Sequence, residues 1–313
     1  MPEIPVFNHD VVLAAVTPEE AIERVRHAFV EYASGEWTMP PKVYLDAYPA
    51  GDFRAMPALG AGHAALKWVT SFPGNPARGL PTVTGVVLLS DAKTGALRAL
   101  FDAAAVTALR TGAAAVLAAE ALGRDDAQTA AVIGAGVNGR AAARTFLAQG
   151  REVALWDLDA ARAEAAAIEL GASVACSQGD ALSADLLVTM TPGHEVLLPE
   201  GSLSPGQHVS LMGADGPGKA EIAVAELARA RVFCDDWEQA SHNGELADAV
   251  AAGEIAQDDV TQLGDVLAGR AEGRHSSEEI TVFDSTGLAI QDLAIVLAAI
   301  ERADELELSS IDL

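Results

Sequence analysis

Apolar residues follow a helical period near the start of the chain. In residues 17–34 they share one helix face, formed by Ala21, Val25, Phe29 and Tyr32. Thr17 can cap this helix, Pro18 suits its first turn and Glu20 completes a capping box. The pattern therefore predicts a helix over residues 17–34.

Between residues 40 and 98 the pattern changes to short apolar segments broken by Gly and Pro. Four of them predict strands, over 43–48, 53–59, 64–72 and 82–91. The sequence DAKTG at 91–95 marks a hairpin, which indicates an antiparallel sheet. A long helix over 103–122, ending at Gly123, follows.

From residue 129 onward, predicted strands alternate with helices. The strands cover 129–136, 152–159, 186–191, 208–215 and 231–236. Helices are predicted over 138–149, in the alanine-rich segment after 159, and over 221–230. This alternation is typical of an α/β fold with a doubly wound parallel sheet. Residues 290–306 predict a final amphipathic helix.

Composition narrows the classes of protein. A length of 313 residues favours two domains, and a net charge of −25 disfavours nucleic-acid binding because it repels phosphates. We expect neither a membrane span nor a signal peptide. Cys176 and Cys234 have no metal-ligand spacing, so we expect no metal site and two buried thiols.

A glycine-rich turn follows the strand at 129–136. It contains Gly134, Gly136 and Gly139 in the spacing GxGxxG, and a helix comes next, as a dinucleotide site requires. Asp157 ends the following strand, where a carboxylate hydrogen-bonds the adenosine ribose and disfavours a 2′-phosphate. This favours NAD over NADP. The alternatives are a glycine turn that binds nothing and a solvated acid at Asp157, since Asp159 lies two positions on.

Charged residues stand within four apolar segments. They are Arg54, Lys67, Arg110 and Asp215. Buried charges are costly unless they are paired or used, and this set could bind and reduce a small oxo or imino acid. The alternatives are structural ion pairs for Lys67 and Arg110, and a helix N-cap for Asp215.

Seven segments together resemble the ornithine cyclodeaminase/mu-crystallin family. They are FRAMP, LKWVTSFPGN, LPTVTGVVLLSDAKTG, ALRTGAAA, GAGVNG, GADGPGKAEI and FDSTGLAIQD, and the match runs from about residue 39 to 292. The resemblance implies an α+β substrate and dimerisation domain from 1–117 plus 287–313, around an NAD-binding Rossmann domain over 118–286. It also implies a homodimer in which this domain's sheet pairs with that of a second subunit.

The resemblance also assigns site residues. The substrate carboxylate would be bound by Lys42, Lys67 and Arg110, and Asp215 would be the acid/base of the cyclodeaminase and alanine dehydrogenase branches. Cofactor contacts would come, besides the three glycines, from Thr82, Arg110, Thr111, Val137, Asn138, Asp157, Lys219, Ser285 and Thr286. Lys67 could polarise the reacting C=O or C=N group, and Asp215 could transfer the proton.

Two positions depart from the family's pattern, and a third keeps it. Ornithine cyclodeaminases carry an acid where this chain has Arg54, and an arginine would repel the distal amine unless it turned outward or paired with Asp52. Lys42 stands where many members have arginine, and loses bidentate geometry. Asp215 is retained, whereas the mu-crystallin branch lacks an acid there.

We therefore expect a cytoplasmic NAD-dependent dehydrogenase or imine reductase of the alanine dehydrogenase type. It would interconvert a small amino acid and its 2-oxo acid or cyclic imine. The alternatives are an ornithine cyclodeaminase and a small-ligand binding protein such as mu-crystallin. Candidate pocket walls, on which the choice of substrate depends, are Trp68, Met56 and Leu80.

Overall fold

The computed structural model describes residues 3–193, 195–216 and 218–312. The chain divides into a terminal unit, Met1–Arg110 with Leu288–Leu313, and a central unit, Thr111–Gly287. The first division lies seven residues before the expected one, within helix α3 (Ala103–Leu122). A continuous helix gives no sequence signal of the residue at which its packing partners change.

The terminal unit contains a seven-stranded sheet in the order β15-β1-β6-β5-β4-β3-β2. Its strands are β1 (Ile4–Phe7), β2 (Val43–Asp46), β3 (Asp52–Gly60), β4 (His63–Ser71), β5 (Val83–Asp91), β6 (Leu97–Asp102) and β15 (Ser309–Ile311). Neighbours from β2 to β6 are antiparallel, as expected. The strands β1, β6 and β15 were not predicted, and β1 pairs in parallel with β6.

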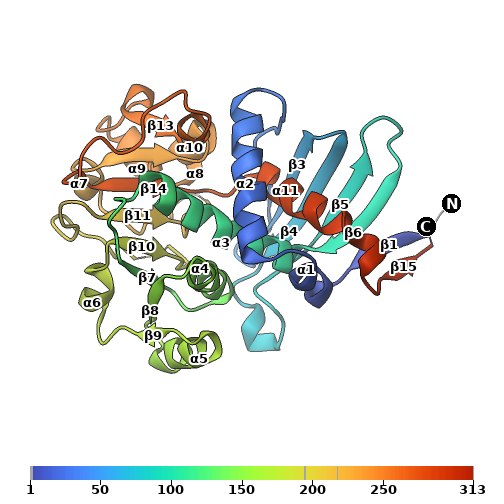
Figure 1. The fold of residues 1–313 in the computed structure, drawn as a ribbon, viewed down its shortest axis with the longest axis horizontal. Helices are drawn as coiled ribbons and strands as arrows, with labels where there is room; N and C mark the ends of the chain where they lie inside the picture. Colours follow the sequence, from blue (N-terminus) through green and yellow to red (C-terminus); the bar gives the residue numbers. More distant parts are fainter. Residues whose placement is uncertain (1–2, 194, 217, 313) are drawn as a thin grey trace. The chain divides into compact units, whose positions relative to one another are not determined.

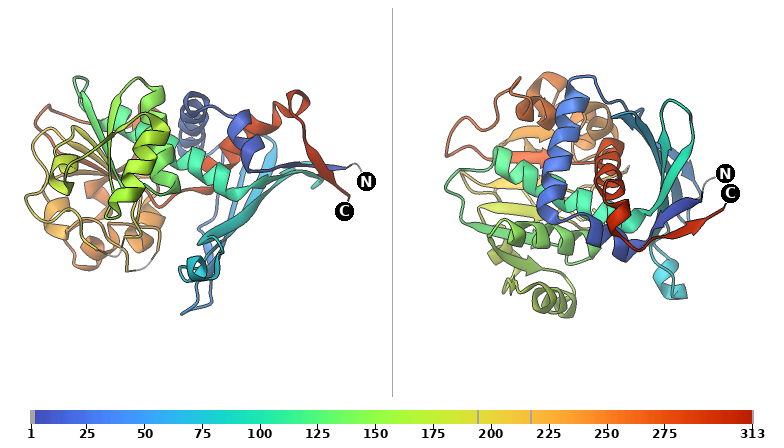
Figure 2. Two further views of the ribbon diagram at one scale, coloured as in Figure 1. Left: turned by 90° about the horizontal axis from the view of Figure 1, so that it is seen from below. Right: turned by 45° about the vertical axis from the view of Figure 1, so that its right-hand side comes forward.

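Helices cover one face of this sheet. The helix α11 (Ala289–Ile300) lies against β3, β4 and β5, and α2 (Pro18–Ala33) packs on α11 (Figure 2). The prediction of an amphipathic α11 was wrong, because Ala289 to Ala299 are buried on all sides between sheet and helix. Shorter helices here are α1 (His9–Ala15), η1 (Asn75–Arg78) and η3 (Ala303–Glu305).

The start of α2 has half of the expected capping box. The Thr17 hydroxyl accepts the N–H of Glu20, as expected. The Glu20 carboxylate instead pairs with Arg24 and with Arg302 on the segment after α11. A long-range partner therefore replaces the local contact that the sequence pattern predicts.

The central unit contains an eight-stranded parallel sheet in the order β13-β12-β14-β11-β10-β7-β8-β9 (Figure 1). Its strands are β7 (Thr129–Ile133), β8 (Glu152–Trp156), β9 (Ser173–Val174), β10 (Leu186–Thr189), β11 (His208–Leu211), β12 (Arg231–Cys234), β13 (Val260–Gln262) and β14 (Thr281–Asp284). The helices are α4 (Val137–Ala148), α5 (Ala160–Leu170), α6 (Gln178–Leu182), α7 (Val224–Leu227), α8 (Trp237–Asn243), α9 (Ala247–Ala251), η2 (Gln257–Asp259) and α10 (Leu263–Leu267). The expected doubly wound α/β class is thus confirmed.

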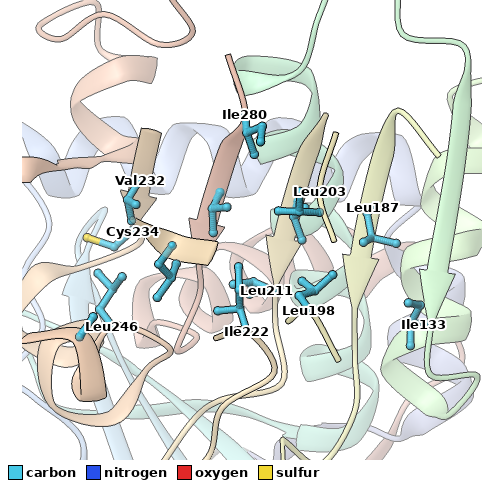
Figure 3. Close-up of a cluster of buried hydrophobic side chains, with 14 of the residues drawn as sticks. Ile133, Leu187, Leu198, Leu203, Leu211, Ile222, Val232, Cys234, Leu246 and Ile280 are labelled. Atoms are coloured by element: carbon cyan, nitrogen blue, oxygen red, sulfur yellow. The ribbon is translucent and has the colours of Figure 1, made fainter. Parts of the chain in front are cut away.

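An apolar core lies along one side of this sheet. Figure 3 shows Leu187 on β10, Leu211 on β11 and Val232 on β12, with Leu198 and Leu246 in the same cluster from the loops and helices. The strands β7, β8, β10 and β11 end two to four residues before their predicted ends. Those residues bend into loops at the carboxyl edge of the sheet, where α/β proteins bind ligands.

Two expectations drawn from composition concern membrane spans and the burial of the cysteines. Helix α3 is long and apolar enough to cross a membrane, but 72% of that apolar window is buried, as in a core helix. Both cysteines are free thiols. Cys234 is buried as expected, whereas Cys176 is exposed, so that prediction was wrong for Cys176.

Candidate active site

The glycine-rich turn of the central unit joins β7 to α4. Gly134 has a φ of +102°, and a Cβ there would lie 2.6 Å from the carbonyl oxygen of Met190. A Cβ at Gly139 would lie 1.7 Å from the carbonyl oxygen of Gly134, so only glycine allows the helix to start so close to the turn. These two close approaches give the turn the form that a dinucleotide site requires.

Space for a phosphate lies beside the second glycine of the motif, Gly136. A Cβ there would meet nothing within 4 Å, and Gly136 provides no side chain to cap α4. The first amides of α4, at Val137 and Asn138, therefore lie at an open helix N-terminus that favours an anion. Val137 is 65% exposed. The residues present fit a pyrophosphate.

Asp157 follows β8 and braces the glycine turn. Its Oδ2 accepts the N–H of Ala135 at 2.8 Å, and its Oδ1 accepts the N–H of Asp159 at 2.9 Å. The Asp157 side chain is 9% exposed, whereas Asp159 is 53% exposed and caps α5. The alternative of a solvated acid therefore describes Asp159, and Asp157 is the held carboxylate beside the turn.

Further predicted cofactor contacts in the central unit are buried. The Thr111 hydroxyl has no hydrogen-bond partner among the described residues, although Thr111 is only 3% exposed. Such a buried hydroxyl suits a ligand amide or phosphate. Ser285 and Thr286 follow β14, and both hydroxyls donate to Asp235, at 3.1 and 3.3 Å.

Asp235 was not among the predicted site residues. It follows β12 and also accepts the N–H of Gly287 at 2.8 Å. The carboxylate thereby holds the whole Ser285–Gly287 turn in place. The signal available in the sequence was an acid near the end of the predicted strand at 231–236, as Asp157 is near the end of the predicted strand at 152–159.

Asp215 lies in the loop after β11. Its Oδ1 is 2.5 Å from Nζ of Lys219, so two predicted site residues form an ion pair. The side chain of Asp215 is 34% exposed. The helix N-cap alternative is wrong, because the next helix that the structure describes, α7, begins at Val224 with Ala223 as its cap.

Glu221 anchors this loop. It accepts hydrogen bonds from the Thr189 hydroxyl at 2.6 Å, the Thr191 amide at 3.0 Å and the Gly213 amide at 3.1 Å. It thereby ties the ends of β10 and β11 to the segment that carries Asp215. Burial raises the pKa of Glu221 above its ordinary range.

A second buried acid, Glu245, supports the first. Its Oε2 accepts the amides of Glu221 and Ile222, at 2.8 and 3.3 Å. Burial, together with repulsion from Glu221 and Asp284, raises the pKa of Glu245 to about 9. Glu245 is therefore neutral at pH 7, and it relieves the repulsion that two buried carboxylates would cause.

The terminal unit holds the predicted cations on the sheet face covered by α11. Lys67 on β4 is 2% exposed, and its Nζ lies 2.8 Å from Oδ1 of Asp292 on α11. Burial lowers the pKa of Lys67 to about 8, and Arg110 and Arg54 act in the same direction, while Asp292 opposes them. Asp292, which the sequence reasoning missed, is thus the partner that keeps Lys67 charged at neutral pH.

Arg110 on α3 joins the same cluster. Its Nε lies 3.7 Å from Oδ1 of Asp292, and its Nη1 donates to Oε1 of Gln291 at 3.4 Å. The Nε atom of Arg110, Oδ2 of Asp292 and Nε2 of Gln291 are buried without a hydrogen-bond partner among the described residues. These groups suit a carboxylate or amine of a bound ligand.

Arg54 on β3 points to the same sheet face. Its Nε lies 2.6 Å from Oδ1 of Asp52, and its side chain is 12% exposed. The alternative of an Arg54–Asp52 pair is therefore the one found, and Arg54 does not turn outward. Lys42 directly precedes the edge strand β2, and its side chain is half-buried.

The structure places the remaining predicted residues of the terminal unit in different surroundings. Met56 lies opposite Lys67 in the β3–β4 pairing and is 5% exposed, so it suits a wall of the site. Trp68 follows Lys67 in the strand and therefore points to the opposite face, so its assignment as a pocket wall was wrong. Leu80 is 54% exposed, and Thr82 is exposed before β5.

Comparisons with known proteins agree with this geometry. The model of the ornithine cyclodeaminase/mu-crystallin family matches residues 7–307. The chain is 42% identical to the alanine dehydrogenase of Archaeoglobus fulgidus over 308 residues, which cover 95% of this chain and 94% of that protein. It is 34% identical to the iminosuccinate reductase of Paracoccus denitrificans over 308 residues, covering 93% and 94%.

A solved structure extends the comparison to the fold. An archaeal alanine dehydrogenase dimer with bound NAD superposes with a TM-score of 0.93 at 39% sequence identity, covering 99% of both chains. The match over nearly the whole length includes both units and every segment in which the site residues lie. The chain belongs to the ornithine cyclodeaminase/mu-crystallin family.

Proposed function

We propose that this protein is an NAD-dependent oxidoreductase that interconverts a small amino acid and its 2-oxo acid or cyclic imine. The observation that carries the proposal is the fully buried Lys67, held by Asp292 among further cations. A lysine at 2% exposure is costly to bury, and its lowered pKa of about 8 suits a group that polarises a substrate. The relatives named as an alanine dehydrogenase and an iminosuccinate reductase support it.

The charges around Lys67 favour an anionic ligand group. Lys67, Arg54 and Arg110 bring three positive charges, and Asp52 and Asp292 bring two negative ones, which leaves one net positive charge. The donors on Arg110 and Gln291 that have no partner in the described part of the chain can bind a carboxylate there. This charge balance suits a small amino acid or its oxo acid.

Each step of the reaction has a residue for it. When bound, NAD accepts or supplies the hydride at the substrate's α-carbon. It would be held by the Gly134–Gly139 turn and Asp157, with Thr111 and the Ser285–Thr286 turn. Lys67 stabilises negative charge on the substrate heteroatom, and Asp215 takes or returns the proton. In the oxidative direction the amino acid loses a hydride and a proton to become an imine, and water then releases ammonia.

Ornithine cyclodeaminase is the second candidate, and one observation favours it. The carboxylate of Asp52 lies on the face that carries Lys67, where it could receive a distal ammonium. It is already engaged by Arg54, however, so a distal ammonium would have to displace a guanidinium. We therefore place ornithine behind a small neutral amino acid.

A panel of substrates tests the proposal. NAD(H)-linked rates would be measured with alanine, ornithine, lysine and proline, and with pyruvate and cyclic imines in reverse. NADH binding would be measured separately by fluorescence. Tight NADH binding without turnover of any panel member would point instead to a small-ligand binding protein.

We also propose that the protein acts as a homodimer. The sheet face opposite α11 carries apolar side chains that are about half exposed, among them Val43, Leu45 and Leu59. Phe53 stacks with Trp68 on this face, at 5.7 Å between ring centroids. Exposed apolar areas of this kind mark protein–protein interfaces, and the archaeal relative is described as a dimer. Light scattering after size-exclusion chromatography would test it.

For its location we propose the cytoplasm. Two free thiols, Cys176 and Cys234, agree with a reducing compartment. We propose neither membrane nor nucleic acid as a partner, given the net charge of −25. Fractionation of cells would test the location.

A further inference from the structure

A guanidinium lies directly beside the carboxylate that faces the ribose position. Arg162, in the first turn of α5, places Nη1 at 3.4 Å from Oδ1 of Asp157 and Nη2 at 3.5 Å from Oδ2 of Asp159. Arg162 is 51% exposed. The sequence motif did not predict an arginine beside Asp157, because the dinucleotide fingerprint specifies only the acid.

This position has a definite chemical meaning. In dinucleotide sites, an acid at the end of the second strand binds the ribose hydroxyls, whereas a nearby arginine accommodates a 2′-phosphate. Here both kinds of residue occupy the same place. The local charge is one positive against two negative, which favours a ribose hydroxyl over a phosphate.

We propose that Arg162 is a 2′-phosphate ligand that Asp157 and Asp159 keep engaged, and that it sets how strongly the site discriminates against NADP(H). The inference rests on the proposed dinucleotide site. The guanidinium itself is half exposed and both of its pairs are long, at 3.4 and 3.5 Å, so they contribute little to stability and a phosphate can draw Arg162 away from the two acids. Arginine binds phosphate through a bidentate geometry that its carboxylate pairs do not use here.

The two acids have separable roles. Asp157 is held by the amides of Ala135 and Asp159, so it stays beside the ribose position whether or not Arg162 moves. Removing its charge therefore removes the repulsion and one of the two carboxylates that hold Arg162, while the pair with Asp159 remains. Asp159 caps α5 by accepting the N–H of Arg162, so its substitution would also disturb the helix start.

Binding of adenosine phosphates tests the proposal without turnover. Dissociation constants for 5′-AMP, 2′,5′-ADP, NADH and NADPH would be measured for the unaltered protein, Asp157→Ser, Arg162→Ala and the double variant. We expect Asp157→Ser to tighten 2′,5′-ADP and NADPH at least tenfold, and the double variant to lose that gain. Arg162→Ala alone should weaken 2′,5′-ADP severalfold and leave 5′-AMP within twofold.

Arg144→Ala is the matched control. Arg144 lies on α4, is 47% exposed and pairs with Glu169 on α5, so it resembles Arg162 in exposure and in having an acidic partner, but that partner is not Asp157. It should change none of the four constants by more than twofold. A gain retained in the double variant would overturn the role of Arg162. If the unaltered protein bound neither NADH nor 5′-AMP, the proposed function itself would fail together with this inference, whereas normal NADH binding with no effect of Arg162 would reject this inference alone.

Discussion

The Nζ atom of Lys67 lies 2.8 Å from Oδ1 of Asp292, and each of these side chains is only 2% exposed. The two residues come from β4 and α11, which lie far apart in the sequence. Breaking a buried pair by removing one partner costs about 3–5 kcal/mol, because the other charge stays buried. The helix α11 therefore sets the charge state of the lysine to which we assign the polarising role.

This pair predicts the alkaline limb of activity. The pKa of Lys67 is lowered from 10.5 to about 8, so its ammonium is lost as the pH rises through 8. We expect kcat/KM to fall above that pH. Asp292→Asn removes a charge that raises the pKa of Lys67, so the limb should move to lower pH. Rates measured from pH 6 to 10 would check it.

Asp292→Glu is the control, since it keeps the carboxylate. The alkaline limb of kcat/KM in this variant should stay near that of the unaltered protein. The same limb in Asp292→Asn and the unaltered protein would mean that Lys67 is not the titrating group.

Asp215 is expected to carry the proton. Asp215→Asn keeps the size of the side chain but cannot take or release a proton, so turnover should fall by about two to four orders of magnitude. The dissociation constant of NADH should change little. Steady-state kinetics and fluorescence titration would measure the two quantities. Asp265→Asn removes an acid paired with Arg270 at 3.1 Å and should leave turnover unaltered. Full activity in Asp215→Asn would refute the assignment.

The Arg54–Asp52 pair predicts the preferred substrate. A distal ammonium beside Arg54 would be repelled by about 4 kcal/mol at 4 Å and an effective dielectric of 20, and Asp52 offsets part of this. We expect kcat/KM for alanine and for pyruvate in reverse, or for a cyclic imine, to exceed kcat/KM for ornithine by about tenfold. Arg54→Glu should shift the ratio toward ornithine.

Asp52→Asn provides the opposite change at the same pair. It leaves Arg54 without its 2.6 Å partner and should lower kcat/KM for ornithine further. Efficient conversion of ornithine to proline by the unaltered protein would instead establish the second candidate function.

Glu245 predicts a pH dependence of stability. Its pKa is raised from 4.5 to about 9, so between these values the unfolded chain loses a proton that the folded protein keeps. The free energy of unfolding should therefore fall with rising pH, by up to about 1.4 kcal/mol per unit. Glu245→Gln does not ionise and should lose this slope. Urea unfolding between pH 5.5 and 8.5 would measure it.

The control is Glu226, which is also buried but pairs with Arg229 at 2.6 Å. Glu226→Gln should lower stability at every pH in this range, without removing the slope. Equal slopes in Glu245→Gln and the unaltered protein would show that Glu245 is already ionised in the folded state.

The sequence by itself determined the features that depend on neighbouring residues. The glycine turn at 134–139, the cap of α2 by Thr17 and the span of α3 were all predicted, because backbone conformation and capping act within a few residues. The alternation of strands and helices likewise determined the parallel sheet of the central unit. The family segments named the site residues one by one.

Only the tertiary structure decided which charges meet. Asp292 is separated from Lys67 by 225 positions, and Arg302 from Glu20 by 282, so no local pattern connects them. The edge strand β15 exists because β1 provides its hydrogen bonds, and α11 is apolar all round because sheet and helix enclose it. Whether Arg54 is free or paired with Asp52 was equally open, since both outcomes satisfy the same strand pattern. Long-range packing decides such partners, because a buried charge takes whatever opposite charge the fold brings within reach.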